Sequence, residues 1–303
     1  MRCQTCGDET SPAFADCQRC GTPLGQPAVT PALPTYAVRG LGTAASIAVG
    51  AATLLYLPGA LFPVIGAQMA RRAADQRDTD LLLGAVVADG MLALPYLVAF
   101  LAGSVLVIIW TWRARKNLDA FPGALPSSSP AWAIAGWLVP LINLVVPPRV
   151  MANIARDSLW RRSTPPLVGL WWAAWLLFTF ADRVVSRSED RRYGELAETP
   201  RDPAEFQAYV DYYQDGTGGR VVPAVACLVA AVSLILLIRR ISAAQQDRIA
   251  RAASAWSGYP GHPAWPTPGA PVPSPGVAPA YPAQPITGPS PQVPPVAGGT
   301  IGA

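Results

Sequence analysis

The sequence lacks most of the side chains on which enzymes rely. Histidine occurs once, as His262 near the C-terminus, and lysine occurs once, as Lys116. A single histidine excludes histidine-based catalytic triads and HExxH metal sites. Neither a GxSxG motif nor a phosphate-binding loop is present. We therefore expect a protein that is not an enzyme.

Charge is also scarce, at 14% of the 303 residues, and the mean hydropathy is +0.28. This composition is too apolar for an ordinary soluble domain and favours a membrane protein. The first twenty residues include Cys, Asp and Glu, whereas a secretory leader needs a basic segment followed by an apolar one. We therefore expect no cleavable leader.

Apolar runs long enough to cross a bilayer occur at residues 41–62, 91–112, 167–181 (with an extension to about 185) and 221–238. The second run has no charge over its 22 residues. At about 1.5 Å per residue it spans about 33 Å, against about 30 Å of hydrocarbon. In lipid such runs form helices, because an isolated strand leaves its backbone polar groups unpaired. The sequence therefore predicts an all-α membrane protein with a four-helix membrane domain over residues 40–245.

A fifth apolar run, Ala131–Pro147, has Pro140 in its middle and Asn143 beyond it. Proline interrupts the helical hydrogen-bond ladder. An amphipathic stretch, Val150–Arg162, follows the run. We predict an interfacial or re-entrant helix between the second and third spans, and a full fifth span is the alternative.

The distribution of Lys and Arg predicts the side on which each segment lies. With four spans and the N-terminus inside, most of the 23 basic residues lie in inner segments, and most acidic residues lie in outer loops at 63–90 and 182–220. Basic residues favour the cytoplasmic side, so we expect a multi-pass protein of the cell membrane with cytoplasmic N- and C-termini. N-terminal cysteines then lie in the reducing cytosol, where thiols stay free to bind metal.

The cysteines near the N-terminus form two CxxC pairs, Cys3–Cys6 and Cys17–Cys20, each followed by glycine. Four thiolates on two tight turns suit a tetrahedral zinc ion in a structural site. The alternatives are unligated cysteines or a redox motif, but a redox motif needs a single CxxC on a thioredoxin-like frame. We predict a zinc ribbon over residues 1–24 with structural zinc, and a Pro-rich linker over residues 25–39.

The charge of the predicted ribbon limits its partners. Only Arg2 and Arg19 are basic within it, too few for a phosphate footprint, so we do not expect nucleic acid as a partner. We expect the lipid bilayer and an unidentified cytosolic or membrane protein as partners.

Two groups of polar residues adjoin the predicted spans. The first follows the aromatic end of the second run and comprises Arg113, Arg115 and Asn117. It is typical of a topological anchor with snorkelling cations, and contact with anionic headgroups is the alternative. The second group comprises Asn143, Arg149, Asn153 and Arg156. The last three share one helical face, which we interpret as the solvated face of an interfacial helix, with a polar pocket as the alternative.

The region after the third run contains a further helix and then a tail. Phe206, Tyr209 and Tyr213 recur at helical spacing within residues 202–214, which predicts an amphipathic helix lying against the membrane or the bundle. No charged residue follows Arg251, and proline becomes abundant. We predict a disordered Pro-rich tail over residues 252–303, either passive or docking on a partner's aromatic groove.

A set of motifs in the central part resembles a known family. The residues are Trp110, Arg113, Arg115, Asn117, Pro130-Ala131-Trp132, Gly136-Trp137-Leu138-Val139-Pro140, Asn143-Leu144, Pro147 and Trp171-Trp172. Their order over residues 40–245 resembles the bacterial domain of unknown function 4328, whose members are multi-pass membrane proteins often preceded by a zinc ribbon. Val145-Val146 stand where that family usually has an aromatic or basic residue. The resemblance implies a membrane domain and no particular activity.

These observations favour a non-enzymatic integral membrane protein with a scaffold or regulatory role, whose zinc ribbon and tail contact proteins. The alternative is a binder or transporter of a small molecule or lipid. That alternative requires a cavity that both Asn143 and Arg149 line.

Overall fold

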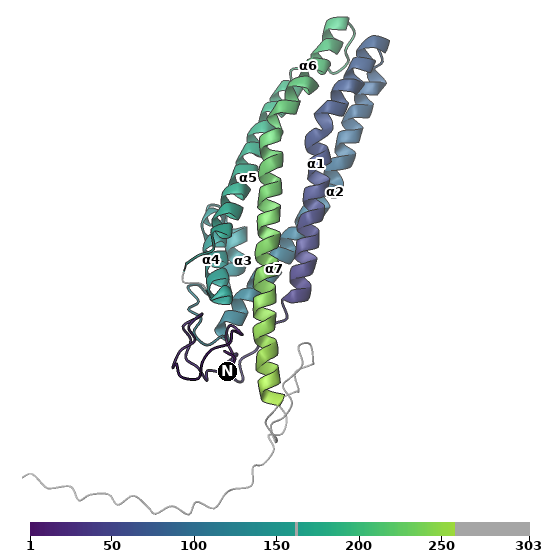
Figure 1. Cartoon of the computed structure of the whole chain (residues 1–303). Coiled ribbons are helices and arrows are strands. Elements are labelled where there is room, and N and C mark those ends of the chain that lie inside the picture. The colour runs from purple at the N-terminus through teal and green to yellow at the C-terminus, as the bar shows by residue number, and fades with distance from the viewer. Residues whose placement is uncertain (161–162, 258–303) are drawn as a thin grey trace, which may run out of the picture. The chain divides into compact units, whose positions relative to one another are not determined.

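The computed structural model describes residues 1–160 and 163–257, with side chains described through Ser254. The helices of this part (Figure 1) are α1 (Arg39–Gln76), α2 (Thr79–Asp119), α3 (Trp132–Leu138), a 3₁₀ turn (Ile142–Leu144), α4 (Val146–Leu159), α5 (Pro166–Tyr193), α6 (Pro203–Gly219) and α7 (Val221–Ser257). Within the described ranges, β structure is limited to two isolated bridges. The chain has four helical stretches long and apolar enough to cross a membrane: α1, α2, α5 and the α6–α7 pair. The predicted all-α fold with four membrane helices is confirmed.

The helices α1 and α2 form a hairpin, and both are longer than the apolar runs that predicted them. The prediction of a loop over residues 63–90 is wrong, because α1 continues to Gln76 and only two residues separate it from α2. Arg77 ends α1 in a left-handed conformation (φ 52°), and Asp78 caps α2 by accepting a hydrogen bond from the N–H of Asp80 (2.9 Å). The helix persists because one face remains buried at helical spacing, through Ala67, Ala70 and Ala73.

The predicted outer loop at 182–220 is also largely helical, since α5 runs to Tyr193 and α6 begins at Pro203. A capping box formed by Asp202 and Glu205 starts α6. The predicted aromatic face of α6 is buried against α1, through Phe206, Tyr209 and Tyr213. Only Arg220 separates α6 from α7, so the two helices are continuous.

The segment between α2 and α5 is bent by 113° between α3 and the stretch Ile142–Leu159. Both ends of this segment meet the same side chain: Gln245 of α7 accepts from Asn117 Nδ2 (2.9 Å) and donates to Ser158 Oγ (2.8 Å). Asn117 lies at the end of α2 and Ser158 at the end of α4. The two ends of the segment therefore lie at the same end of the bundle. This agrees with the predicted interfacial or re-entrant helix, whereas a fifth span would have its two ends at opposite ends of the bundle.

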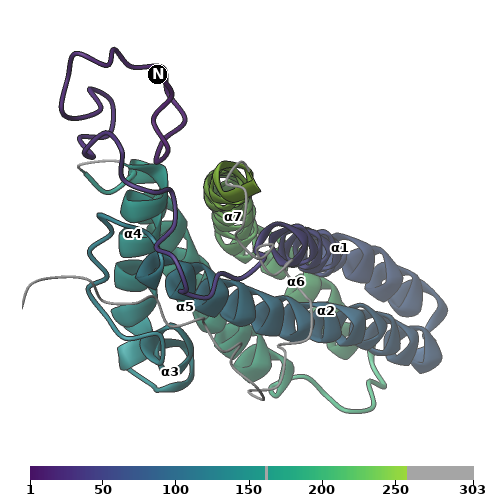
Figure 2. The ribbon, with the colours of Figure 1, turned by 90° about the horizontal axis from the view of Figure 1, so that it is seen from below.

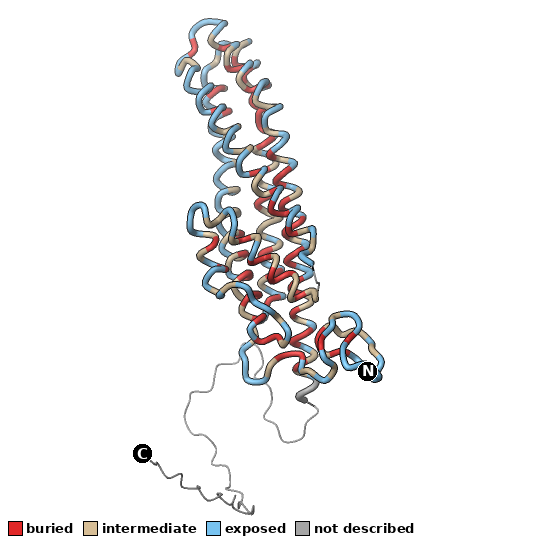
Figure 3. Tube along the Cα trace, turned by 90° about the vertical axis from the view of Figure 1, so that its left-hand side faces the viewer, coloured by how far each residue is buried: buried red, intermediate tan, exposed pale blue. Residues whose placement is uncertain are grey.

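The main core lies where the helices of the bundle meet this bent segment (Figures 2 and 3). Seen from below in Figure 2, α1 lies between α2 and α7, and it contacts both. A Cβ at Gly42 of α1 would lie 2.5 Å from Ser242 Oγ, so only glycine permits this approach of α1 to α7. Buried positions follow the line where helices meet, whereas much of α2 exposes apolar side chains outward, as a lipid-facing helix does.

The segment predicted as a linker, residues 25–39, packs on the bundle. Ala28 and Val29 are buried in the main core, and Thr30 N–H donates to Ala120 O (2.8 Å). At the other end of the chain, α7 includes residues 252–257 of the predicted tail. The rest of that tail, residues 258–303, lies outside the described residues.

Candidate metal centre

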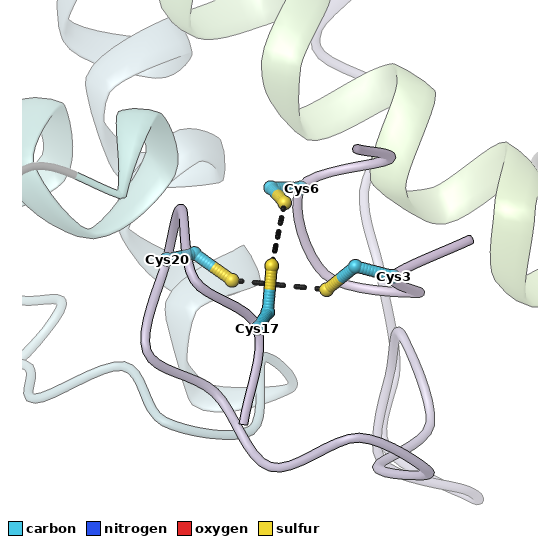
Figure 4. A group of neighbouring side chains, drawn as sticks. All are labelled: Cys3, Cys6, Cys17 and Cys20. Atoms are coloured by element: carbon cyan, nitrogen blue, oxygen red, sulfur yellow. Dashed lines mark hydrogen bonds between the residues drawn. The ribbon is translucent and has the colours of Figure 1, made fainter. Parts of the chain in front are cut away.

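The four predicted cysteine ligands converge from two loops near the N-terminus (Figure 4). Their sulfur atoms all lie within 4.8 Å of one another. The Sγ atoms of Cys3 and Cys20 are 3.7 Å apart, those of Cys6 and Cys17 are 3.6 Å apart, and all four thiols are free. Each close pair joins one cysteine of the first CxxC to one of the second, so the two pairs interleave.

Both CxxC pairs have the same local structure. In each, the first cysteine donates its N–H to the carbonyl five residues later, and the glycine after the pair donates to the carbonyl of that cysteine, at 2.7 to 2.9 Å. The two glycines, Gly7 and Gly21, have φ values of +80° and +68°. This is the left-handed region that a side chain disfavours, which explains why glycine follows each pair.

The cluster fits a tetrahedral zinc ion. A Zn–S bond of about 2.3 Å places the sulfurs of an ideal tetrahedron about 3.8 Å apart, and the two closest sulfur pairs approach that spacing. Cys3 and Cys17 are buried, while Cys6 and Cys20 are half-buried. Four thiolates leave no open position for a substrate, so the donor set suits a structural metal rather than a catalytic one.

The thiols differ in acidity because their surroundings differ. Burial raises the pKa of the Cys3 thiol, but hydrogen bonds from the backbone at Cys6 and Thr5 outweigh it and lower the pKa to about 6. Burial raises the pKa of the Cys6 and Cys20 thiols. The Cys3 thiol therefore ionises more readily than those of Cys6 and Cys20, which must lose their protons when a metal binds.

Arg251 of α7 holds the cysteine module, residues 1–24, against the end of the bundle. Its Nε donates to Gln4 O (3.0 Å) and its Nη2 donates to Thr5 O (2.6 Å). These are the two residues between the cysteines of the first pair. The predicted metal site is therefore attached to the last membrane helix by direct hydrogen bonds.

Arg248, one turn earlier, joins three segments beneath the module. Its Nε donates to Ala28 O (2.6 Å) and its Nη2 to Pro122 O (3.0 Å). The guanidinium carbon lies 4.4 Å from the ring centroid of Phe121 and 4.3 Å from that of Trp160. Only 1% of Arg248 is exposed, so it cross-links the linker, the loop after α2 and the end of α4.

The three residues of the first predicted polar group differ in burial. Asn117 is fully buried: its Oδ1 accepts from Tyr36 N–H (2.7 Å), and its Nδ2 donates to Tyr36 O and to Gln245. Arg115 is buried too, and donates to Ser128 O and to Asp119 Oδ1 (2.8 Å). Both are structural and unavailable to lipid headgroups. Arg113 is half-buried and donates to the linker carbonyl of Ala37 (3.3 Å).

The second predicted polar group is not brought together. The interpretation of one solvated face is wrong for Asn153, which is buried and bonds Ser127 N–H and Leu125 O (both 3.1 Å). Arg149 is exposed and Arg156 is half-buried. Asn143 lines a cavity of about 300 Å³ between the helices, and Arg149 is not among the residues that line it. This cavity therefore does not bring Asn143 and Arg149 together, as the predicted alternative of a polar pocket requires.

Sequence reasoning missed Gln245, Arg248 and Arg251, because the apolar run was taken to stop at Arg239-Arg240. A pattern that continues past that pair could have found two of them. Buried positions recur at spacings of three and four, at Ile238, Ile241, Gln245, Arg248 and Ala252.

A family model described as Domain of unknown function (DUF4328) matches residues 72–243, more than half of the chain. The match begins inside α1 and ends inside α7, so it covers the hairpin partner α2, the bent segment, α5 and α6 but not the cysteine module. No curated protein and no solved structure matches the chain.

Proposed function

We infer that this chain, which belongs to the DUF4328 family, is a non-enzymatic protein of the cell membrane whose zinc-bound cysteine module is a docking platform for another protein. One observation carries the proposal: Arg251 bonds the module directly to α7, while the outer loop of the module is exposed. All residues of that loop, 11–16, are exposed, and Phe14 in it is 48% exposed. An exposed aromatic side chain on a fixed support is typical of a binding hot spot.

Zinc would be held by Cys3, Cys6, Cys17 and Cys20, and it would supply folding free energy rather than chemistry. The module has little other means of folding, because its main buried apolar side chains are two of the cysteines themselves. The segment 7–16, which contains the exposed loop 11–16, joins the two CxxC pairs, so the metal fixes both ends of the segment that carries the docking loop. Loss of metal should therefore abolish docking even though no loop residue is a ligand.

Two observations support the proposal that the module and the end of α7 lie on the same side of the membrane. Arg251 touches the module, and four crossings return the chain to the side from which it started. The excess of Lys and Arg in the segments at this end favours the cytoplasmic side. We therefore propose that the module faces the cytosol, where its thiols stay reduced.

The proposal is tested by purifying the full chain from membranes with its bound proteins, beside three variants. The double variant Cys3→Ser/Cys6→Ser should lose zinc and the bound partner while inserting normally. Phe14→Ser should lose the partner and retain stoichiometric zinc. Arg240→Ser, at an exposed position of α7, is the matched control and should retain both. A partner retained by the zinc-free variant would contradict the proposal.

A further inference from the structure

The cavity between the helices has the composition of a lipid site rather than of a solvent channel. It measures about 300 Å³, at the small end of ligand pockets. Its walls come from α1, α2, α3, α5 and α7, and no charged side chain is among its lining residues. A charge buried there would have no partner, at a cost of several kcal/mol, so the occupant is neutral.

The cavity is long and narrow. On α2 its lining extends from Tyr96 to Ile108, which at about 1.5 Å per residue is about 18 Å. On α5 it extends from Trp171 to Phe178. These lengths suit a single extended hydrocarbon chain lying along the helices rather than a compact molecule.

The wall between α2 and α5 is thin. In the described residues of these two helices, no pair of Cα atoms approaches within 8 Å. Phe100 of α2 and Trp175 of α5 bridge the interval as a stacked pair, with ring centroids 6.2 Å apart. Both rings line the cavity, so this aromatic pair fills the interval between the two helices beside it.

One polar group in the cavity has no partner. Asn143 Oδ1 is buried and has no hydrogen bond within the described structure. An unpaired buried acceptor costs about 1–3 kcal/mol, which a ligand that donates to it would recover. The hydroxyls of Thr53 and Ser104 differ, because they already donate to the carbonyls of Val49 (2.9 Å) and Phe100 (2.8 Å).

We propose that this cavity binds a neutral single-chain lipid alcohol, with its hydroxyl on Asn143 and its hydrocarbon chain along α2, α5 and α7 toward Tyr96. Asn143 lies in the bent segment, whose ends meet at the end of the bundle that holds the cysteine module. The hydroxyl therefore sits nearer that end and the chain points toward the bilayer centre. A hydroxyl donates and accepts, so it pairs with either atom of the amide, whereas an ether only accepts.

The experiment uses the full chain in lipid nanodiscs and two photoreactive probes, a hexadecanol with a mid-chain diazirine and its methyl ether. The alcohol should label peptides containing residues 96–108 and 171–178, with an affinity about tenfold higher than that of the ether, because only the alcohol donates to Asn143. Equal labelling by the two probes, or labelling spread over the lipid-facing surface of α2, would overturn the proposal.

Three variants distinguish a loss of binding at the cavity from a general loss of protein stability. Asn143→Leu should weaken alcohol labelling about tenfold and leave ether labelling unchanged. Thr43→Ala is the matched control, because Thr43 is exposed, lies outside the cavity lining and has a hydroxyl that already bonds Arg39 O (3.0 Å), and it should label as the wild type does. Ala231→Leu narrows the cavity and should weaken labelling by both probes. If Asn143→Leu does not fold, unchanged labelling of Ala231→Leu overturns the proposal on its own.

Competition with unlabelled lipids distinguishes the sources of the alcohol. A long-chain prenol, with one chain, should displace the probe, whereas a diacylglycerol, with two, should not fit a cavity of about 300 Å³. Displacement by diacylglycerol as strong as that by the prenol would contradict the single-chain assignment.

Discussion

Two arginines lie near the two ends of α7 and are stabilised in opposite ways: Arg220, half-buried, comes just before the helix, and Arg248, buried, lies in its last third. Arg220 forms a two-armed ion pair with Glu189 of α5, with Nε and Oε1 2.9 Å apart. Arg248 has no acidic partner in the described part of the chain and lies among carbonyl oxygens and aromatic rings. At about 1.5 Å per residue the two are about 42 Å apart, similar to a bilayer with its headgroups at about 40–45 Å.

The difference between the two arginines indicates that the two ends of the membrane domain have different structural roles. An ion pair between two side chains clamps two helices, and a pair of apolar side chains can replace it. The surroundings of Arg248 are backbone atoms of the linker and of the loop after α2, so no second substitution can compensate for its loss. One end is a helix clamp, whereas the other assembles loops that carry the cysteine module.

The largest effect should come from Arg248→Met. Methionine keeps much of the apolar stem but loses two hydrogen bonds from a charged donor and two ring contacts, so we expect the free energy of unfolding to fall by about 3 kcal/mol. Unfolding in mixed micelles measures this, and hydrogen exchange should rise at residues 28–30 and 120–124. Arg240→Met, at an exposed position of the same helix, is the control. No extra exchange in the linker would show that Arg248 does not hold it.

A smaller effect should follow from breaking the ion pair at the other end. Glu189→Leu leaves Arg220 unpaired, and because these side chains are still 12% and 25% exposed, we expect a loss of about 2 kcal/mol rather than the full cost of a dry site. The double variant Glu189→Leu/Arg220→Met should return close to the wild-type stability. The same micelle titration checks both, and a double variant as unstable as the single one would refute the contrast between the two arginines.

A substitution where α1 approaches α7, near the end of the bundle that holds the module, should destabilise the protein less. At Gly42→Ala the new Cβ would lie 2.5 Å from Ser242 Oγ and 3.1 Å from Trp110 Nε1, atoms that share a hydrogen bond of 2.9 Å. We expect a loss of about 1–2 kcal/mol, measured as a lower unfolding midpoint and a red-shifted tryptophan emission. Adding Ser242→Ala should recover part of the loss, since it removes the closest atom. No recovery would mean that the backbone, not the hydroxyl, limits this approach.

The sequence predicted the membrane helices and the cysteine cluster because both signals are local. Hydrophobic length identifies a span, and CxxC spacing places two thiols on one turn. Helix ends were predicted less well, because the end of an apolar run was taken as the end of the helix: the first run stops at residue 62 and the fourth before Arg239, whereas α1 continues to Gln76 and α7 to Ser257. A charged residue marks where the lipid-facing part of a helix stops, but the helix itself can continue beyond it.

The polar residues show where local reasoning stops. Asn117 and Asn153 are ordinary in the sequence, and both prove to be buried partners of backbone atoms more than 25 positions away. Such pairings depend on how the loops fold onto the helices, which neither composition nor periodicity encodes. Asn143 was singled out as the polar residue of the apolar run, but it lies in the 3₁₀ turn, whereas Arg149 lies at an exposed position of α4.

The smallest effect on the bundle should come from Arg251→Met, which tests the link between the module and α7. Arg251 bonds Gln4 and Thr5 of the module only through their carbonyls, and it is half-buried, so global unfolding should change by less than about 1 kcal/mol. Zinc should instead escape several-fold faster to a chelator, because the first CxxC loop loses its support. Arg240→Met again serves as the control. Equal rates of zinc release from the two variants would mean that the contact with α7 does not stabilise the metal-binding loop. The cysteine module would then retain its metal independently of the membrane domain.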